Sequence, residues 1–137
     1  MKVGVLATMM ALLLVGGFSL SAQAGPAPDM DSDGTVDVQD ICKLNPTSPS
    51  PNACDTDTDG YGNACDADFN DDGTVGVPDF PTFSGAFGTT GAPCFHEADT
   101  NGDGTVGIPD FPTFSGSFGG PPGPSGLSCA GVTNPCP

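Results

Sequence analysis

The chain has few of the side chains that nucleic-acid binding requires. It contains no Trp and no Arg, and Lys2 and Lys43 are its only Lys residues, against 17 acidic residues and a formal net charge of −15. Nucleic acids and anionic membranes attract clusters of Lys and Arg. We therefore expect neither of them as a partner.

Candidate catalytic groups are also scarce. Nucleophilic catalysis needs a nucleophile beside a base, and the chain has one His, His96. His96 next to Glu97 is the one pair that would supply a base and an acid to orient it. The interpretation we prefer places His96 at the surface, in a loop between repeats, and we predict that the protein is not an enzyme.

Long hydrophobic runs are limited to one. The segment VGVLATMMALLLVGGFSL follows the basic start Met1–Lys2 and precedes small residues at Ala22 and Ala24. This is the layout of a secretory signal peptide cleaved after Ala24, and a membrane anchor is the alternative. We expect residues 1–24 to be removed, and the rest to be secreted or held at the cell surface without contacting the membrane.

The chain has an even number of Cys residues, six, all after the predicted cleavage site. In a secreted chain this indicates disulfides, and their spacing is unlike that of zinc ligands. Six Cys allow 15 pairings, which the sequence leaves open; a bond from Cys94 to Cys129 is one way to hold the C-terminal tail. The disulfide candidates are Cys42, Cys54, Cys65, Cys94, Cys129 and Cys136.

A repeated spacing of acidic residues is the main positive feature. An oxygen-only calcium loop has ligands at places 1, 3, 5, 7, 9 and 12, with Gly at place 6 for a sharp turn and a backbone carbonyl at place 7. Four segments follow this template: loop 1 (29–40), loop 2 (55–66), loop 3 (68–79) and loop 4 (99–110). Every Asp except Asp71 falls at a ligand place. The sequence therefore predicts calcium as the cofactor, with up to four ions.

The predicted ligands are the same kinds of oxygen in each loop. At place 9 of loops 3 and 4 the chain has Gly76 and Gly107, where a water would complete the shell. The predicted calcium ligands are Asp29, Asp31, Asp33, Thr35, Asp37 and Asp40 in loop 1; Asp55, Asp57, Asp59, Tyr61, Asn63 and Asp66 in loop 2; Asp68, Asn70, Asp72, Thr74 and Asp79 in loop 3; and Asp99, Asn101, Asp103, Thr105 and Asp110 in loop 4.

Loops 3 and 4 begin two nearly identical segments, DFNDDGTVGVPDFPTFSGAFG at 68–88 and DTNGDGTVGIPDFPTFSGSFG at 99–119. Pro78 and Pro109 stand where a helix start tolerates proline, and Gly88 and Gly119 stop the helices. We predict two short helices that pack Phe against Phe across a pseudo-two-fold axis; a binding surface is the alternative role for the rings. The fold class that follows is small, loop-rich, mainly α and irregular, and stapled by disulfides. The Phe residues at i, i+3 and i+7 are Phe80, Phe83 and Phe87, and Phe111, Phe114 and Phe118.

These motifs resemble two known families. The two loop-plus-helix units of 68–119, with D-x-N-x-D-G-T-V and Asp at place 12, resemble a type I dockerin. The calcium loops of 25–67, which also contain a Pro/Ser-rich linker, resemble thrombospondin type 3 repeats, and a Pro/Gly/Cys-rich tail follows at 120–137. The dockerin resemblance implies calcium-dependent folding and docking onto cohesin modules. In that family the residues just before the last ligand, often Ser or Thr, help to contact cohesin; here they are Val77–Pro78 and Ile108–Pro109.

Two functions remain open from the sequence. One is a secreted, calcium-stabilised module that binds an extracellular protein, cohesin-like by resemblance. The other is a structural or matrix protein of the cell exterior that associates with itself and is rigidified by calcium and disulfides. The repeated pair favours the first function, and the upstream loops favour the second.

Overall fold

The computed structural model describes residues 26–46 and 54–136. Within them the chain forms two helices, α1 (Phe80–Ala86) and α2 (Phe111–Ser117), and one isolated bridge between Thr90 and Thr105, and it has no other strand pairing. None of the helices in this part of the chain is long and apolar enough to cross a membrane. The predicted fold class is confirmed, whereas the predicted signal peptide, 1–24, lies outside the described residues.

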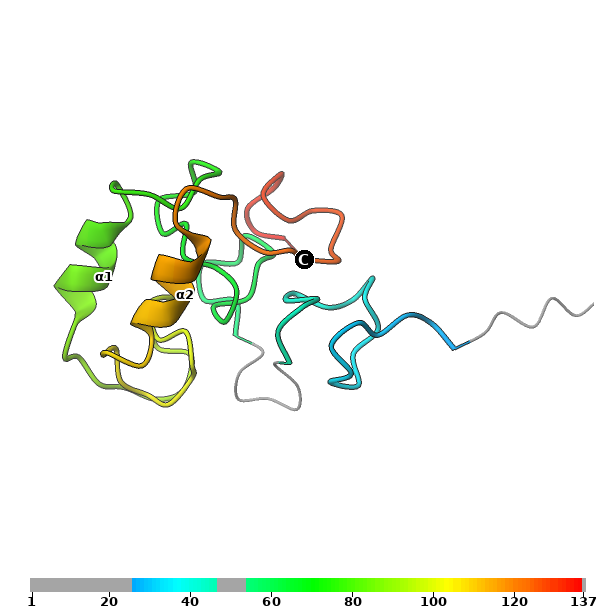
Figure 1. Ribbon diagram of the computed structural model, residues 1–137, viewed down its shortest axis with the longest axis horizontal. Coiled ribbons are helices and arrows are strands. Elements are labelled where there is room, and N and C mark those ends of the chain that lie inside the picture. The colour runs from blue at the N-terminus through cyan, green and yellow to red at the C-terminus, as the bar shows by residue number, and fades with distance from the viewer. Residues whose placement is uncertain (1–25, 47–53, 137) are drawn as a thin grey trace, which may run out of the picture.

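The two helices lie together at one end of the molecule and run in opposite directions (Figure 1). Residues 26–46 lie at the other end, and the C-terminal segment lies between the two ends. Most of the chain between these parts is loop, so the molecule depends on turns, disulfides and a small core for its shape.

The helices begin later than the sequence predicted. They start at Phe80 and Phe111, just past Pro78 and Pro109, and the second proline of each repeat occupies the first turn. The reason is the Asp that precedes each helix. In loop 3 this residue is Asp79, and its carboxylate accepts hydrogen bonds from two backbone amides of its own loop. These bonds hold the preceding residues in a turn, and the helix begins only after it.

Each helix ends against loop 3 or loop 4 of the other repeat. Gly88 and Gly119 follow the helices with φ of 83° and 84°, which Gly adopts at little cost. Their amides donate at 2.8 Å to the carbonyls of Val106 and Val75, which are fully buried. Each valine returns a hydrogen bond to the segment after the helix, at 2.8 Å for Val75 and 3.1 Å for Val106. The pseudo-two-fold pair is therefore held by crossed backbone contacts as well as by side chains.

The core contains fewer Phe rings than the sequence predicted. Only the middle ring of each set, Phe83 and Phe114, is buried, and the two rings stack with centroids 6.4 Å apart. Val75, Val106 and small Ala side chains complete the core. The flanking rings remain exposed because they stand at the first residue of each helix and just past its last residue, whereas Phe83 and Phe114 lie in its middle. The prediction that all six rings form the core was wrong for four: Phe80, Phe87, Phe111 and Phe118.

Three disulfides join parts of the chain that the sequence did not pair. The bonds are Cys42–Cys65, Cys54–Cys94 and Cys129–Cys136. The suggested bond from Cys94 to Cys129 is wrong, because Cys94 pairs with the residue just before loop 2 and the tail closes a turn of its own. The Cys54–Cys94 bond links the upstream loops to the segment between the two helical repeats.

The C-terminal tail packs on loops 1 and 2. The amide of Gly126 donates to the carbonyl of Asp40 at 2.7 Å, in loop 1. In loop 2, Thr58 accepts the amide of Cys136 at 2.7 Å and Asp59 accepts that of Gly131 at 3.0 Å. The tail thus supplies hydrogen-bond donors that the two upstream loops lack by themselves.

Candidate metal centre

The four loops share one backbone conformation. In each loop, places 4 and 6 have a positive φ, a left-handed conformation that is common only for Gly, Asn and Asp. Two left-handed residues so close together tighten the chain, and the side chains at places 1, 3 and 5 gather on its inner side. The φ angles are 63° for Ser32, 66° for Thr58, 56° for Asp71 and 69° for Gly102 at place 4, and 96° for Gly34, 97° for Gly60, 87° for Gly73 and 87° for Gly104 at place 6.

Three recurring hydrogen bonds fix these side chains. The amide at place 6 donates to the carboxylate at place 1, at 2.7–3.1 Å. The amide at place 5 donates to the side-chain oxygen at place 3, at 2.8–3.3 Å. The amide at place 7 donates to the Asp at place 5, at 2.7–3.0 Å. Such side-chain turns are local, so each loop orients its first ligands with its own backbone.

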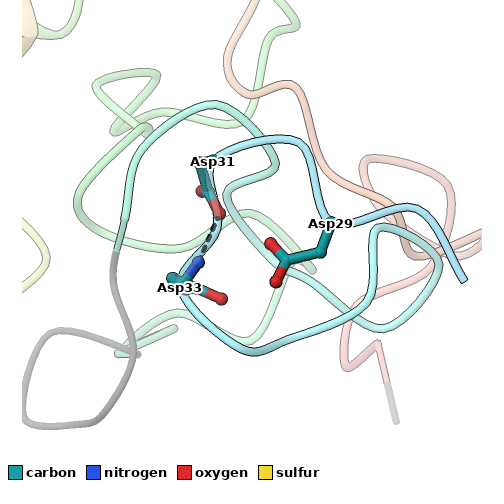
Figure 2. A group of neighbouring side chains, drawn as sticks. All are labelled: Asp29, Asp31 and Asp33. Atoms are coloured by element: carbon teal, nitrogen blue, oxygen red, sulfur yellow. Dashed lines mark hydrogen bonds between the residues drawn. The ribbon is translucent and has the colours of Figure 1, made fainter. Parts of the chain in front are cut away.

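In loops 1 and 2 three carboxylates converge. One oxygen from each of Asp29, Asp31 and Asp33 lies within 4.8 Å of the others, as do oxygens of the three corresponding Asp residues of loop 2. Figure 2 shows the loop 1 carboxylates on the inner side of the turn, with the amide of Asp33 bonded to Asp31. Like charges this close repel each other, so a bound cation would stabilise the arrangement.

Several carboxylate oxygens are buried without a hydrogen bond from any described residue. They include an oxygen of the place 1 Asp in loops 1, 2 and 4. Lys43 is the only Lys in the described part of the chain, so the protein itself offers almost no positive charge. A buried, unpaired carboxylate is costly, and hard oxygen ligands of this kind are those that Ca²⁺ prefers. The residues present therefore fit calcium. The oxygens concerned are Asp29 Oδ1, Asp31 Oδ2, Asp40 Oδ2, Asp55 Oδ1 and Asp99 Oδ1.

Loops 3 and 4 are closed by the Asp at place 12. The carboxylate of Asp79 accepts the amides at places 3 and 9, at 3.1 and 2.7 Å. Asp110 accepts the same two amides of loop 4, again at 3.1 and 2.7 Å. Both side chains are fully buried. Place 12 is therefore folded back on its own loop, while Gly76 and Gly107 at place 9 contribute only backbone.

Loops 1 and 2 are closed by place 9 instead. There the side chain at place 9 accepts the amide at place 2, at 2.8 Å for Asp37 and 3.0 Å for Asn63. The place 12 carboxylates bond the amide two residues further on, at 2.8 Å for both Asp40 and Asp66. The 12-residue template did not predict this second form of closure. The template treats places 9 and 12 as ligand places in every loop and does not say which of the two closes the loop.

Burial raises the pKa of several of these carboxyls. It raises the pKa of Asp66 to about 8, and the nearby carboxylates of Asp59 and Asp57 add to the effect. It raises the pKa of Asp59 to about 6, again with help from neighbouring Asp residues. The pKa values of Asp40 and Asp99 are raised for the same first reason. Each such group favours a bound proton or cation over a bare negative charge.

The residues at place 7 were predicted to coordinate through their backbone. Their amides make the turn bond to place 5 in all four loops. Tyr61 differs from the three Thr residues because its ring lies against the tail, where Gly123 and Gly131 leave no space for a side chain. Tyr61 also lines a cavity of about 240 Å³ between loops 2 and 3 and the tail.

Two acidic residues that occupy no predicted ligand place, Asp71 and Glu97, lie close to loop 2. Burial raises the pKa of Glu97 to about 7, and the carboxylates of Asp57 and Asp71 contribute. Asp71 in turn has a raised pKa, through burial first and Asp57 second. Sequence spacing does not group Glu97 with Asp57 and Asp71, because Glu97 lies in the segment between the two helical repeats, far from loop 2 in the chain.

No protein-family model and no curated protein matches the chain. Among solved structures, a type II cohesin-dockerin domain from Bacteroides cellolosolvens is similar, with 27% identity over 40% of this chain and 85% of that chain, and a TM-score of 0.36. The resemblance of loops 1 and 2 to thrombospondin type 3 repeats stays a prediction.

Proposed function

We propose that this protein is a secreted, non-catalytic module that binds another protein outside the cell and is held in its binding conformation by calcium. The observation that carries the proposal is a set of exposed apolar residues on and just before the two helices, which follow directly on loops 3 and 4 and their oxygen side chains. Calcium stabilises the fold in this proposal, and the helices provide the contact surface.

The ligand set supports the calcium part. Calcium, when bound, supplies positive charge to the carboxylates of each loop. The carboxylates at places 1, 3 and 5 of loops 1 and 2, and Asp with Asn at the same places of loops 3 and 4, would hold it. Since Asp79 and Asp110 stand immediately before α1 and α2, filling loops 3 and 4 fixes the start of each helix.

The contact surface consists of the exposed apolar residues of the two repeats, which we call the helical face. Val77 and Ile108 are 74% and 77% exposed, and the four flanking Phe rings are 42–53% exposed. Large apolar side chains that gather on a surface mark interaction sites more often than isolated ones do. The helical face consists of Val77, Phe80, Phe87, Ile108, Phe111 and Phe118.

A cohesin-like protein is the partner that the dockerin resemblance suggests. Val77 and Ile108 occupy the positions that help to contact cohesin in that family, and here they are apolar rather than hydroxyl-bearing. The partner surface that fits them is therefore apolar at its centre. Self-association through the same face is the competing outcome, and it would move the proposal toward a matrix protein.

The test is size-exclusion chromatography with light scattering on residues 25–137, in millimolar calcium and in EDTA, followed by calorimetric titration with cohesin modules. We expect a monomer that is compact with calcium, expanded without it, and able to bind a cohesin only with calcium. The double variant Val77→Ser, Ile108→Ser should lose binding while staying folded. Val132→Ser is the matched control, because Val132 is equally exposed, at 77%, but lies in the tail. Calcium-driven oligomers would favour the matrix alternative, and identical behaviour in calcium and EDTA would contradict the proposal.

A further inference from the structure

Loop 4 contains a dipeptide that loop 3 lacks. Places 3 and 4 are Asn101–Gly102 in loop 4 and Asn70–Asp71 in loop 3. The two loops are otherwise alike in backbone conformation and in the hydrogen bonds that close them. The molecule therefore carries its own comparison for any chemistry that depends on the residue after Asn.

Both polar atoms of the Asn101 side-chain amide form hydrogen bonds with Asp103. Its Oδ1 accepts the backbone amide of Asp103 at 2.8 Å, and its Nδ2 donates to the carboxylate of Asp103 at 3.1 Å. This turn folds the side chain back over the peptide bond that follows it. Because Oδ1 reaches the amide of Asp103, the side chain of Asn101 is folded toward the backbone that follows it, which includes the nitrogen of Gly102.

We propose that Asn101 is a site of spontaneous deamidation. The backbone nitrogen of Gly102, losing its proton to solvent, forms a bond to Cγ of Asn101, and the side-chain nitrogen takes a proton and leaves as ammonia. Water then opens the resulting succinimide to aspartate or isoaspartate, so the net change is one water consumed and one ammonia released. Negative charge develops on Oδ1 during the attack, and the amide of Asp103 already donates to that atom.

The residue after Asn explains why loop 4 reacts and loop 3 does not. Asn70 has the same two bonds, from the amide of Asp72 at 3.0 Å and to its carboxylate at 3.1 Å. Asp71, however, places a Cβ and a negative charge next to the attacking nitrogen. The Cβ hinders the approach of this nitrogen to Asn70, and the charge opposes the loss of the proton from the nitrogen. Gly102 has neither, so Asn101 is the faster site.

Calcium should protect Asn101, an expectation that rests on the proposed function. Gly102 is buried, and its amide donates to the carbonyl of Asp99 at 3.3 Å, a bond that the attack must break. The reaction therefore needs this bond to open, whereas the local turn between Asn101 and Asp103 can persist while it does. A bound ligand at ten times its dissociation constant lowers the open population about tenfold, and the rate should fall by the same factor.

The two products would affect loop 4 differently. Aspartate at place 3 would give loop 4 the same three acids that loops 1 and 2 carry at places 1, 3 and 5. Isoaspartate would lengthen the backbone between places 3 and 4 and displace the turn that orients Asp103. Deamidation is thus a chemical change that alters one calcium loop while leaving loop 3 intact.

The single Glu of the chain makes the test direct. The full chain is incubated at mildly alkaline pH with calcium or with EDTA, reduced, and cleaved after Glu97, and the fragments are weighed by mass spectrometry. The downstream fragment contains Asn101 and Asn134, and Asn134 cannot react because Pro135 has no amide proton. In EDTA we expect this fragment to gain the mass of an amide-to-acid conversion at least about ten times faster than with excess calcium, while Asn70 in the upstream fragment stays unchanged.

Exchanging the two residues provides the matched controls. Gly102→Asp should stop the reaction at Asn101, and Asp71→Gly should start one at Asn70 in the upstream fragment. An unreacted Asn101 in EDTA, or equal rates at Asn70 and Asn101 in the natural sequence, would overturn the modification site whatever calcium does. Equal rates at Asn101 in calcium and in EDTA would overturn only the protection, and would count against loop 4 as a calcium site.

Discussion

Replacing Asp99 by Asn should stabilise the protein without calcium and destabilise it with calcium. One oxygen of Asp99 accepts the amide of Gly104 at 3.0 Å, and the other is buried without a hydrogen bond from any described residue. Burial, together with Asp110 and Asp103, raises the pKa of Asp99. An uncharged amide keeps the shape of the side chain and removes the buried charge.

The magnitude follows from two opposing effects. An unsatisfied buried polar group costs about 1–3 kcal/mol, and more when it is charged. Asp99→Asn removes the charge but keeps a buried polar group, so it should raise the unfolding free energy in EDTA by at most about that amount. A calcium site adds about 1.4 kcal/mol of stability at ten times its dissociation constant and about 2.7 kcal/mol at a hundred times. With dissociation constants on the order of 10⁻⁴ M, the effect of the variant should change sign at about 1–10 mM calcium.

The assay is urea unfolding followed by far-UV circular dichroism across a calcium series. The natural protein should lose α1 and α2 in EDTA while its disulfides stay intact, and the Asn variant should retain more helix there. Asp71→Asn is the control, because Asp71 lies at no predicted ligand place; its effect should vary with calcium less than that of Asp99→Asn, since Asp71 acts on loop 2 only through the nearby charge of Asp57. A variant at Asp99 that destabilises equally with and without calcium would refute the assignment of this carboxylate as a ligand.

Two further predictions use the same assays. The pKa of Asp66 is raised from 3.8 to about 8. Its contribution to the stability of the calcium-free fold is therefore fully present below about pH 4 and is lost as the pH rises through about 8. Asp66→Asn should flatten this decline in urea unfolding, and an unchanged pH profile in the variant would contradict the prediction. Truncating the buried Phe83 to Ala should cost about 3–5 kcal/mol in urea unfolding, whereas Phe87→Ala, at an exposed ring, should cost about 0.5 kcal/mol or less. Equal losses would show that the core is misassigned.

The loops could be predicted from the sequence because their geometry is local. Alternating oxygen side chains and one Gly determine which atoms face inward, and the bonds that orient places 1, 3 and 5 join residues no more than five apart. The two helices could be predicted for a similar reason, from Phe spacing and the Gly that ends each one. Their start could not, because it depends on Asp79 and Asp110 folding back onto their loops.

The disulfides, the buried rings and the position of the tail depend on contacts between distant segments. Nothing near Cys54 in the chain indicates that its partner is Cys94, at a sequence separation of 40, rather than a nearer Cys. The choice of Phe83 over Phe87 for the core likewise depends on where the opposite helix ends. Spacing alone assigns the same role to both rings.

The junction of loops 2 and 3 shows why the upstream and downstream parts act together. Only Ala67 separates the two loops, and it is fully buried in the core beside Val75 and Phe114. Asp66, the last acid of loop 2, accepts the amide of Asp68, the first acid of loop 3, at 2.8 Å. A change in the charge of Asp66 therefore acts on the residue that begins the neighbouring loop. Loop 3 in turn fixes the start of α1, which carries part of the helical face. The hydrogen bond from the amide of Asp68 to Asp66 therefore connects the last acid of loop 2 to the part of the structure that holds this face.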